Sequence, residues 1–180
     1  MQLFSSLLPD GARVLDVGCG TGVPVDAYLV AQGFTVTGVD LSYRIIELAR
    51  VNVPVATYLQ GSMTTMAFNK EFDGIVASYS MLLLDPLAFK VAAKAIGRSL
   101  TRDGLCYVSL NEPVDLDVDC DEDALISLQG HEMYSRAYTK DEVMAAFHDA
   151  GMVVNHFDRR TITSELFGEE HMMEFLFTRV

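Results

Sequence analysis

The sequence has little that suits a membrane-spanning or secreted protein. No apolar run in its 180 residues approaches the roughly 18 residues that a bilayer-spanning helix requires. Residues 1–8 have neither the basic flank nor the small-residue cleavage site of a secretory signal. We therefore expect a cytoplasmic protein that has no membrane partner.

Cysteine and basic residues are also few. The three cysteines are scattered and form no Cys-x-x-Cys pair, which argues against a disulfide framework or a zinc site. Only 13 lysines and arginines stand against 25 aspartates and glutamates, so the net charge is −12. A surface of this charge repels phosphate backbones. Lys90, Lys94 and Arg98 share one face of a predicted helix, but we interpret them as solvated charges and expect no nucleic-acid partner.

Short β-branched segments alternate with helical segments along most of the chain. This alternation is typical of a parallel sheet with helices on both faces. The length is that of one domain, so we expect a single domain over residues 1–180. Strands are predicted at residues 12–17, 35–39, 55–59, 73–78, 105–110, 153–157 and 173–178, and helices at 23–32, 42–51, 86–100 and 139–151.

The last two predicted strands have no helix between them, so we expect them to pair in antiparallel fashion. The predicted fold is therefore an α/β, Rossmann-like sheet of seven mostly parallel strands, with one reversed strand near the edge and helices on both faces. Thr139 and Glu142 form a capping-box pattern for the last helix. Apolar spacing predicts which helix positions are buried: Ile45, Leu48 and Ala49 in one helix, and Leu87, Val91 and Ala95, with Ala92 and Ile96 alongside, in another.

An acidic segment interrupts this alternation. Seven acidic residues lie between positions 112 and 123, with no basic residue among them. Such a run repels itself and is typical of a solvated loop. The spacing of Asp115, Asp117 and Asp119 resembles a calcium loop, but the turn glycine and the terminal glutamate are missing. We interpret residues 112–133 as an inserted acidic loop or lid and expect no metal site.

A glycine-rich turn follows the first predicted strand and carries most of the functional signal. The segment reads Val-Leu-Asp-Val-Gly-Cys-Gly-Thr-Gly over residues 14–22. Gly18, Gly20 and Gly22 can take positive φ and leave room for a ligand against the backbone. The free N–H groups of the turn and of the helix start attract electron-rich ligand atoms.

Asp40 ends the second predicted strand, 18 residues after Gly22. Ligands of open α/β sheets bind outside the carboxyl ends of the strands, where an acid at this position can accept both hydroxyls of a ribose. Dinucleotide-binding enzymes carry G-x-G-x-x-G, whereas this chain has G-x-G-x-G with Asp16 two residues before the first glycine. An acid there suits an ammonium group, and both features favour S-adenosylmethionine (SAM) over a nicotinamide dinucleotide.

Residues 14–22 resemble motif I of the class I SAM-dependent methyltransferases, and the wider layout is similar to the same family. The resemblance implies that the loop residues surround the methionine part of the cofactor, that Asp40 binds the ribose and that Leu41 packs on the adenine. It places the residue that bonds the adenine amino group after the third strand, at Ser62 and Met63, where Ser62 stands in place of the frequent Asp. It also implies that Ser78 and Tyr79 face the methyl-transfer site. The cofactor-binding residues expected are Asp16, Gly18, Cys19, Gly20, Asp40, Leu41, Ser62, Met63 and Ser78.

Several alternatives remain at this point. Ser62 can equally be a turn residue without a ligand, and Cys19 is better explained as a small packing residue than as a nucleophile. Methyl transfer needs a general base only if the acceptor must lose a proton, and the candidates are Tyr79, Glu112 and His131.

The expected function is transfer of a methyl group from SAM to a small-molecule acceptor. The main alternative is a catalytically inactive protein of the same fold that binds a ligand or a partner. Only 13 residues precede Val14, where the resemblance implies a helical segment that closes over the cofactor. The chain is therefore expected to be an N-terminally short variant or a fragment.

Overall fold

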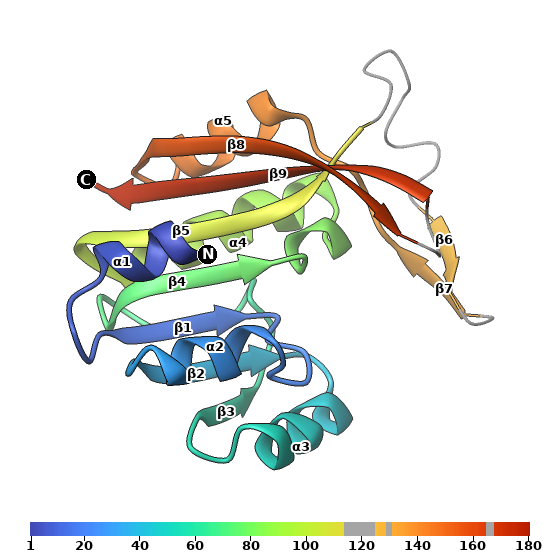
Figure 1. Cartoon of the computed structure of the whole chain (residues 1–180). Helices are drawn as coiled ribbons and strands as arrows, with labels where there is room; N and C mark the ends of the chain where they lie inside the picture. The colour runs from blue at the N-terminus through green and yellow to red at the C-terminus, as the bar shows by residue number, and fades with distance from the viewer. Residues whose placement is uncertain (114–124, 129–130, 165–167) are drawn as a thin grey trace.

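The structure is a computed structural model that describes residues 1–113, 125–128, 131–164 and 168–180. Its main element is a seven-stranded sheet of order β3-β2-β1-β4-β5-β9-β8 (Figure 1). The strands are β1 (Arg13–Val17), β2 (Thr35–Asp40), β3 (Thr57–Gln60), β4 (Phe72–Ser78), β5 (Leu100–Glu112), β8 (Met152–Ser164) and β9 (Gly168–Arg179). The helices are α1 (Gln2–Leu7), α2 (Val25–Ala31), α3 (Tyr43–Asn52), η1 (Met81–Leu83), α4 (Pro86–Ser99) and α5 (Lys140–His148).

The strand pairing confirms the predicted fold. Strands β3, β2, β1, β4 and β5 pair in parallel, whereas β9 runs antiparallel to both of its neighbours, β5 and β8. The reversed strand thus lies second from the edge of the sheet. Because β1, β2 and β4 run in the same direction, their carboxyl ends meet at one edge, to which their arrowheads point in Figure 1.

Helices cover both faces of the sheet, with α1 and α2 in front and α4 and α5 behind in Figure 1. Alternate residues of β1 enter different cores: Val14 packs with α1 and α2, whereas Leu15 and Val17 pack with α4 and α5. The unanticipated helix α1 buries Phe4 against the sheet. A side chain at Gly74 would meet the Phe4 ring at 2.7 Å, so glycine at this position lets α1 pack directly on β4.

Two helices bury a different stripe from the predicted one. In α3 the buried residues are Ile46 and Ala49, while Leu48 is 51% exposed, so the expectation for Leu48 is wrong. Among the described residues, the main contacts of this helix with the sheet are with β2 and β3 at its edge, where a narrow stripe suffices.

Helix α4 is likewise turned away from its predicted orientation. Leu87 and Val91 are exposed, contrary to expectation, whereas Ala92, Ala95 and Ile96 are buried as predicted. Phe89 sets this orientation because its ring stacks on Tyr138 at 4.2 Å between centroids.

The strands near the C-terminus are longer than predicted. Strand β5 begins at Leu100, five residues earlier than predicted, and includes Asp103 and Gly104. The strand is irregular there, because its pairing with β4 shifts register between Phe72 and Gly74. Asp103 has φ +62° there. Pairing of β8 with β9 continues to Ser164 and Gly168, because backbone hydrogen bonds extend a hairpin beyond its apolar stretch.

The predicted lid, residues 112–133, lies partly in the described chain. Most of its acidic run, residues 114–123, falls outside the described residues. The described parts include β6 (Leu125–Leu128), which pairs in antiparallel fashion with β7 (His131–Tyr134) as a separate two-stranded sheet. Within the described ranges, no helix is both long and apolar enough to cross a membrane.

Candidate functional site

A cleft of about 350 Å³ opens at the carboxyl ends of β1, β2, β3 and β4. Its volume lies in the range of small-ligand sites, about 300–1,000 Å³. Six of the predicted cofactor-binding residues line it: Gly18, Gly20, Asp40, Leu41, Ser62 and Met63. The remaining lining residues are Val39, Gly61, Tyr79, Ser80, Leu83 and Leu84. The structure therefore brings together residues from four strand ends, as the rule for open α/β sheets predicts.

The glycine loop has the backbone conformation that the sequence predicts. Gly18, Gly20 and Gly22 have φ of +76°, +54° and +76°. The N–H of Gly18 donates to the Val39 carbonyl at 2.7 Å, which ties the loop to β2. Since side chains rarely adopt this region of φ, glycine is required for the turn itself.

The free space at Gly18 is smaller than the sequence led us to expect. A Cβ atom at Gly18 would lie 2.3 Å from the Cβ of Ser80. Ser80 is buried, and its hydroxyl donates to the Val17 carbonyl at 2.6 Å. Gly18 is thus required by the close approach of a neighbouring strand end, whereas Gly20 has nothing within 4 Å of its would-be Cβ. Of these two glycines, Gly20 leaves the open space for a ligand.

Asp40 has its carboxylate at the cleft and already accepts two backbone hydrogen bonds. Its Oδ2 accepts from the Gly20 N–H at 3.1 Å, and its Oδ1 accepts from the Ser42 N–H at 2.9 Å. These bonds orient the side chain. A carboxylate offers about four acceptor positions, so two remain for the hydroxyls of a ribose.

Leu41 and Ser62, the residues expected near the adenine, both line the cleft. Leu41 is 72% exposed, which leaves its apolar face available to a ligand. The Ser62 hydroxyl accepts from the Thr64 N–H at 3.2 Å and lies 2.8 Å from the Thr64 hydroxyl. Ser62 therefore stabilises a turn and also lines the cleft, so both roles considered for it are compatible with its position.

Three of the predicted cofactor residues do not line the cleft. Asp16 is 2% exposed and lies behind the loop. Cys19 packs in a core cluster with α3 and β3, where burial raises the pKa of its thiol, as expected of a packing residue. Ser78 lies 3.0 Å from Ser109, hydroxyl to hydroxyl, between β4 and β5. For these residues, the expected contact with the cofactor is not visible in the geometry of the cleft.

The three candidate bases occupy different environments. Tyr79 lines the cleft with φ +51°, a strained value for a bulky residue. Burial, with Glu170 and Glu174 nearby, raises the pKa of its hydroxyl, so Tyr79 stays protonated at neutral pH. Glu112 is 7% exposed and forms an ion pair with Arg159. His131 lies on β7, and its side chain falls outside the described part of the structure.

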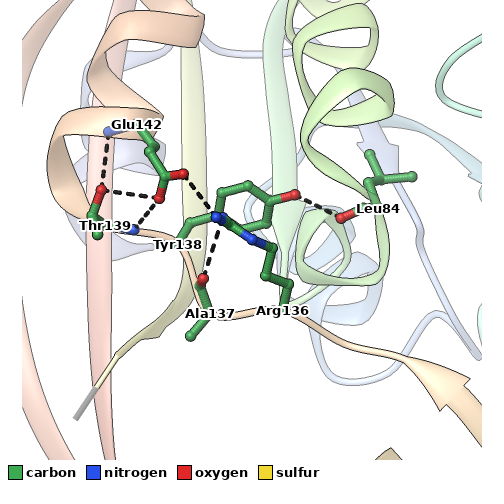
Figure 2. A network of polar contacts seen from close by, with 6 residues as sticks. All are labelled: Leu84, Arg136, Ala137, Tyr138, Thr139 and Glu142. Carbon is green, nitrogen blue, oxygen red and sulfur yellow. Dashed lines mark hydrogen bonds and ion pairs between the residues drawn. The ribbon is translucent and has the colours of Figure 1, made fainter. Parts of the chain in front are cut away.

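A polar network holds one wall of the cleft in place (Figure 2). The Tyr138 hydroxyl donates to the Leu84 carbonyl at 2.6 Å. The Arg136 backbone N–H donates to the Leu82 carbonyl, outside the residues drawn, at 2.8 Å. Arg136 also pairs with Glu142 at 3.0 Å, and Glu142 completes the predicted capping box with Thr139. The segment before α5 is therefore attached both to that helix and to the cleft wall.

Residues 80–84 contribute to the cleft, although the sequence did not predict it. The signal available was the apolar stretch Met81–Leu84 directly after a predicted strand. Nothing in that stretch indicates that it forms the short helix η1 and turns Leu83 and Leu84 toward the cleft.

A larger cavity, of about 460 Å³, lies between α1 and the sheet at β5, β8 and β9. Its charged residues Arg160 and Glu174 already pair with each other at 3.0 Å. It contains neither the glycine loop nor the strand-end carboxylate. We therefore place the functional site at the cleft.

The residues of the cleft fit SAM. A glycine with open space, an oriented carboxylate and an exposed apolar side chain match the amino-acid tail, the ribose and the adenine respectively. Asp16, beneath the loop, has one buried carboxyl oxygen without a hydrogen-bond partner among the described residues. The fold and the cleft define a class I, SAM-dependent methyltransferase architecture.

The chain belongs to the methyltransferase domain family, whose model matches residues 14–104, about half of the chain. An uncharacterized methyltransferase of Synechocystis sp. is 34% identical over 115 residues, covering 63% of this chain and 54% of that protein. The chain thus spans about half the length of that relative.

Two further relatives differ in what their names say they methylate. A dTDP-3-amino-3,4,6-trideoxy-alpha-D-glucopyranose N,N-dimethyltransferase of Streptomyces venezuelae is 27% identical over 169 residues, covering 87% of this chain and 70% of that protein. A 23S rRNA (uracil(747)-C(5))-methyltransferase of Pyrococcus horikoshii is 32% identical over 109 residues, covering 57% of this chain and 24% of that protein.

Solved structures share the fold. A SAM-dependent methyltransferase of Methanosarcina mazei has a TM-score of 0.87 at 16% identity, covering 100% of this chain and 98% of that one. A Burkholderia thailandensis 1,6-didemethyltoxoflavin-N1-methyltransferase was solved with bound 1,6-didemethyltoxoflavin and S-adenosylhomocysteine. It has a TM-score of 0.76 at 22% identity, covering 99% of this chain and 76% of that one. At these identities the likeness establishes the fold alone.

Proposed function

We propose that this chain transfers the methyl group of SAM to a small-molecule acceptor in the cytoplasm. The observation that carries the proposal is a single cleft that extends from Asp40 and the glycine loop to Tyr79 and the η1 wall. One end has the groups that suit an adenosyl ligand. The other end is lined by Tyr79, Leu83 and Leu84, which can contact an acceptor.

When bound, SAM supplies a methyl group that is already activated by its sulfonium. The protein then has mainly to hold the acceptor atom, the methyl carbon and the sulfur in line. Asp40 and the glycine loop hold the cofactor end. Leu83 and Leu84, held through the Tyr138 bond to the Leu84 carbonyl, form an apolar wall for the acceptor end.

Tyr79 serves this reaction as a hydrogen-bond donor. Because its hydroxyl stays protonated at neutral pH, it can orient an acceptor oxygen or nitrogen but cannot remove a proton. Glu112 is held in its ion pair with Arg159. The arrangement favours an acceptor with a lone pair that can attack before it loses a proton, the proton then leaving to water.

The charge of the protein supports a small acceptor over a nucleic acid. The net charge of −12 disfavours a phosphate backbone. The Streptomyces relative, which the alignment covers over most of both chains, is named for a sugar nucleotide acceptor. The relative named for ribosomal RNA is matched over only 24% of its length.

The test is transfer of a labelled methyl group from SAM to cellular fractions. Purified protein is incubated with a small-molecule extract and, separately, with total RNA. We expect label in the small-molecule fraction alone, with transfer lost in Asp40→Ala. Label in RNA alone would refute the acceptor class. Cofactor binding without transfer to either fraction would favour a catalytically inactive ligand-binding or partner-binding module.

A further inference from the structure

Two buried carboxyl groups lie near each other next to the glycine loop. Asp16 on β1 and Asp26 on α2 are 2% and 0% exposed, and the charge of Asp26 is the strongest of the charges that act on Asp16. Two like charges buried close together disfavour each other, which favours a proton on one of the two carboxyl groups. Asp26 was not among the predicted site residues.

The surroundings of this pair contain acids and neutral groups. The Tyr58 hydroxyl on β3 donates to Asp26 Oδ2 at 2.9 Å. Burial is the main reason that the pKa of each carboxyl group is raised; the negative charge of Asp26 and, less strongly, of Asp40 raises the pKa of Asp16 further. The nearby Cys19 thiol also has a raised pKa and is neutral. The charges that act on the pair therefore disfavour a second negative charge.

Each member of the pair also has one unused acceptor. The Oδ1 atoms of Asp16 and Asp26 are buried and have no hydrogen-bond partner among the described residues. A buried polar atom without a partner costs free energy, about 1–3 kcal/mol in typical cases. Such atoms are unsatisfied in this structure and suit an additional donor or positive charge.

The pair lies next to the loop that suits the amino-acid tail of the cofactor. A Cβ atom at Gly22 would lie 2.6 Å from the Tyr58 hydroxyl oxygen and 3.4 Å from Asp26 Oδ2. Asp16 directly precedes the loop, two residues before Gly18. A positive charge that enters the loop is thus placed close to the carboxyl pair.

We propose that Asp16 and Asp26 share one proton in the free protein and release it when the ammonium group of an adenosyl amino-acid ligand binds at the glycine loop. The ammonium charge replaces the charge of the departing proton, which passes to solvent, and Tyr58 continues to donate to Asp26. Asp26 is then a positioning residue for cofactor capture. This inference concerns the cofactor alone and is independent of the methyl acceptor.

The first test is calorimetric titration of the wild-type protein in buffers of different ionisation enthalpy, which measures protons released per ligand bound. S-adenosylhomocysteine carries the amino-acid tail, whereas 5′-methylthioadenosine has the same nucleoside and a thioether but no ammonium group. Near pH 7 we expect release of up to one proton with S-adenosylhomocysteine and none with 5′-methylthioadenosine. The association constant of S-adenosylhomocysteine should rise up to about tenfold per pH unit over the pH range in which protons are released. Equal release with both ligands would overturn the proposal.

The second test compares matched variants. Asp26→Asn keeps the shape and the acceptor for Tyr58 but removes one acid, so we expect less proton release near pH 7 and a pH dependence displaced to lower pH. Asp103→Asn makes the same chemical change at an exposed acid and should match the wild type. An Asp26→Asn protein with the wild-type release and pH profile would refute the pair. If the wild-type protein bound no S-adenosylhomocysteine, the cofactor assignment would fail along with this inference.

Discussion

Substitution of Asp40 tests the ribose assignment directly. In Asp40→Ala, the ligand loses a carboxylate that can accept hydrogen bonds from both ribose hydroxyls. Hydrogen bonds to a charged group contribute roughly 1–3 kcal/mol. We therefore expect the Kd for S-adenosylhomocysteine to rise about 5- to 150-fold.

The same substitution removes two bonds within the protein, those from the N–H groups of Gly20 and Ser42. Each contributes about 0.5–1.5 kcal/mol to stability, so a lower Tm is expected as well. Asp40→Asn separates the two effects because its amide oxygen retains one acceptor without the charge. Its affinity should fall between those of the wild type and Asp40→Ala. Kd is measured by calorimetry and Tm by thermal unfolding.

Asp73→Ala is the matched control. Asp73 also accepts a backbone hydrogen bond, from the Arg13 N–H at 2.9 Å, and forms an ion pair with Arg13, but at the opposite edge of the sheet. We expect it to lower Tm without changing Kd. If Asp40→Ala bound the ligand with wild-type affinity, or if Asp73→Ala weakened binding equally, the carboxylate would have no specific role in the cleft.

Three further predictions follow from the structure. Gly20→Ala should weaken cofactor binding at least tenfold. Gly11 also has positive φ and open space but lies outside the cleft, so Gly11→Ala should lower Tm alone. Equal cofactor affinities of the two variants would show that Gly20 leaves no space for the ligand. Leu41→Ala should raise the Kd for S-adenosylhomocysteine with little change in Tm because the side chain is 72% exposed, while Leu87→Ala, 73% exposed and off the cleft, should change neither. The pKa of the Asp26 carboxyl is raised in the folded protein. Its contribution to the free energy of unfolding is therefore complete below the unfolded pKa of about 3.9 and is lost as pH rises through the folded pKa, with a slope of up to about 1.4 kcal/mol per pH unit. The free energy of unfolding of Asp26→Asn, relative to that of the wild type, should therefore increase as pH rises from 4 to 8. Denaturant unfolding measures both values, and a constant difference across that range would contradict the raised pKa.

Features that depend on neighbours within a few residues can be predicted from the sequence alone. The glycine loop after β1 and the capping box of Thr139 and Glu142 both depend on such spacings and appear as predicted. The order of strands and helices, and the reversal of β9, follow from which connections contain a helix. Asp40 was placed at the cleft because parallel strands end at a common edge.

The tertiary structure alone decided how these elements contact one another. Leu48 and Leu87 have the apolar character of buried residues, yet the helix faces that meet the sheet are those of Ile46 and Phe89. Periodicity indicates that a helix has an apolar face, but the neighbouring surface selects the residues that occupy it.

The site shows the same division. The partners of Gly18 and Asp26, namely Ser80 and Tyr58, lie more than 30 residues away in sequence and reach them only after β4 and β3 take their places in the sheet. Local patterns specify a residue's backbone conformation because its immediate neighbours restrict it. The pairing of distant side chains, and with it the protonation of the buried acids, depends on packing across the whole domain, which no local pattern records.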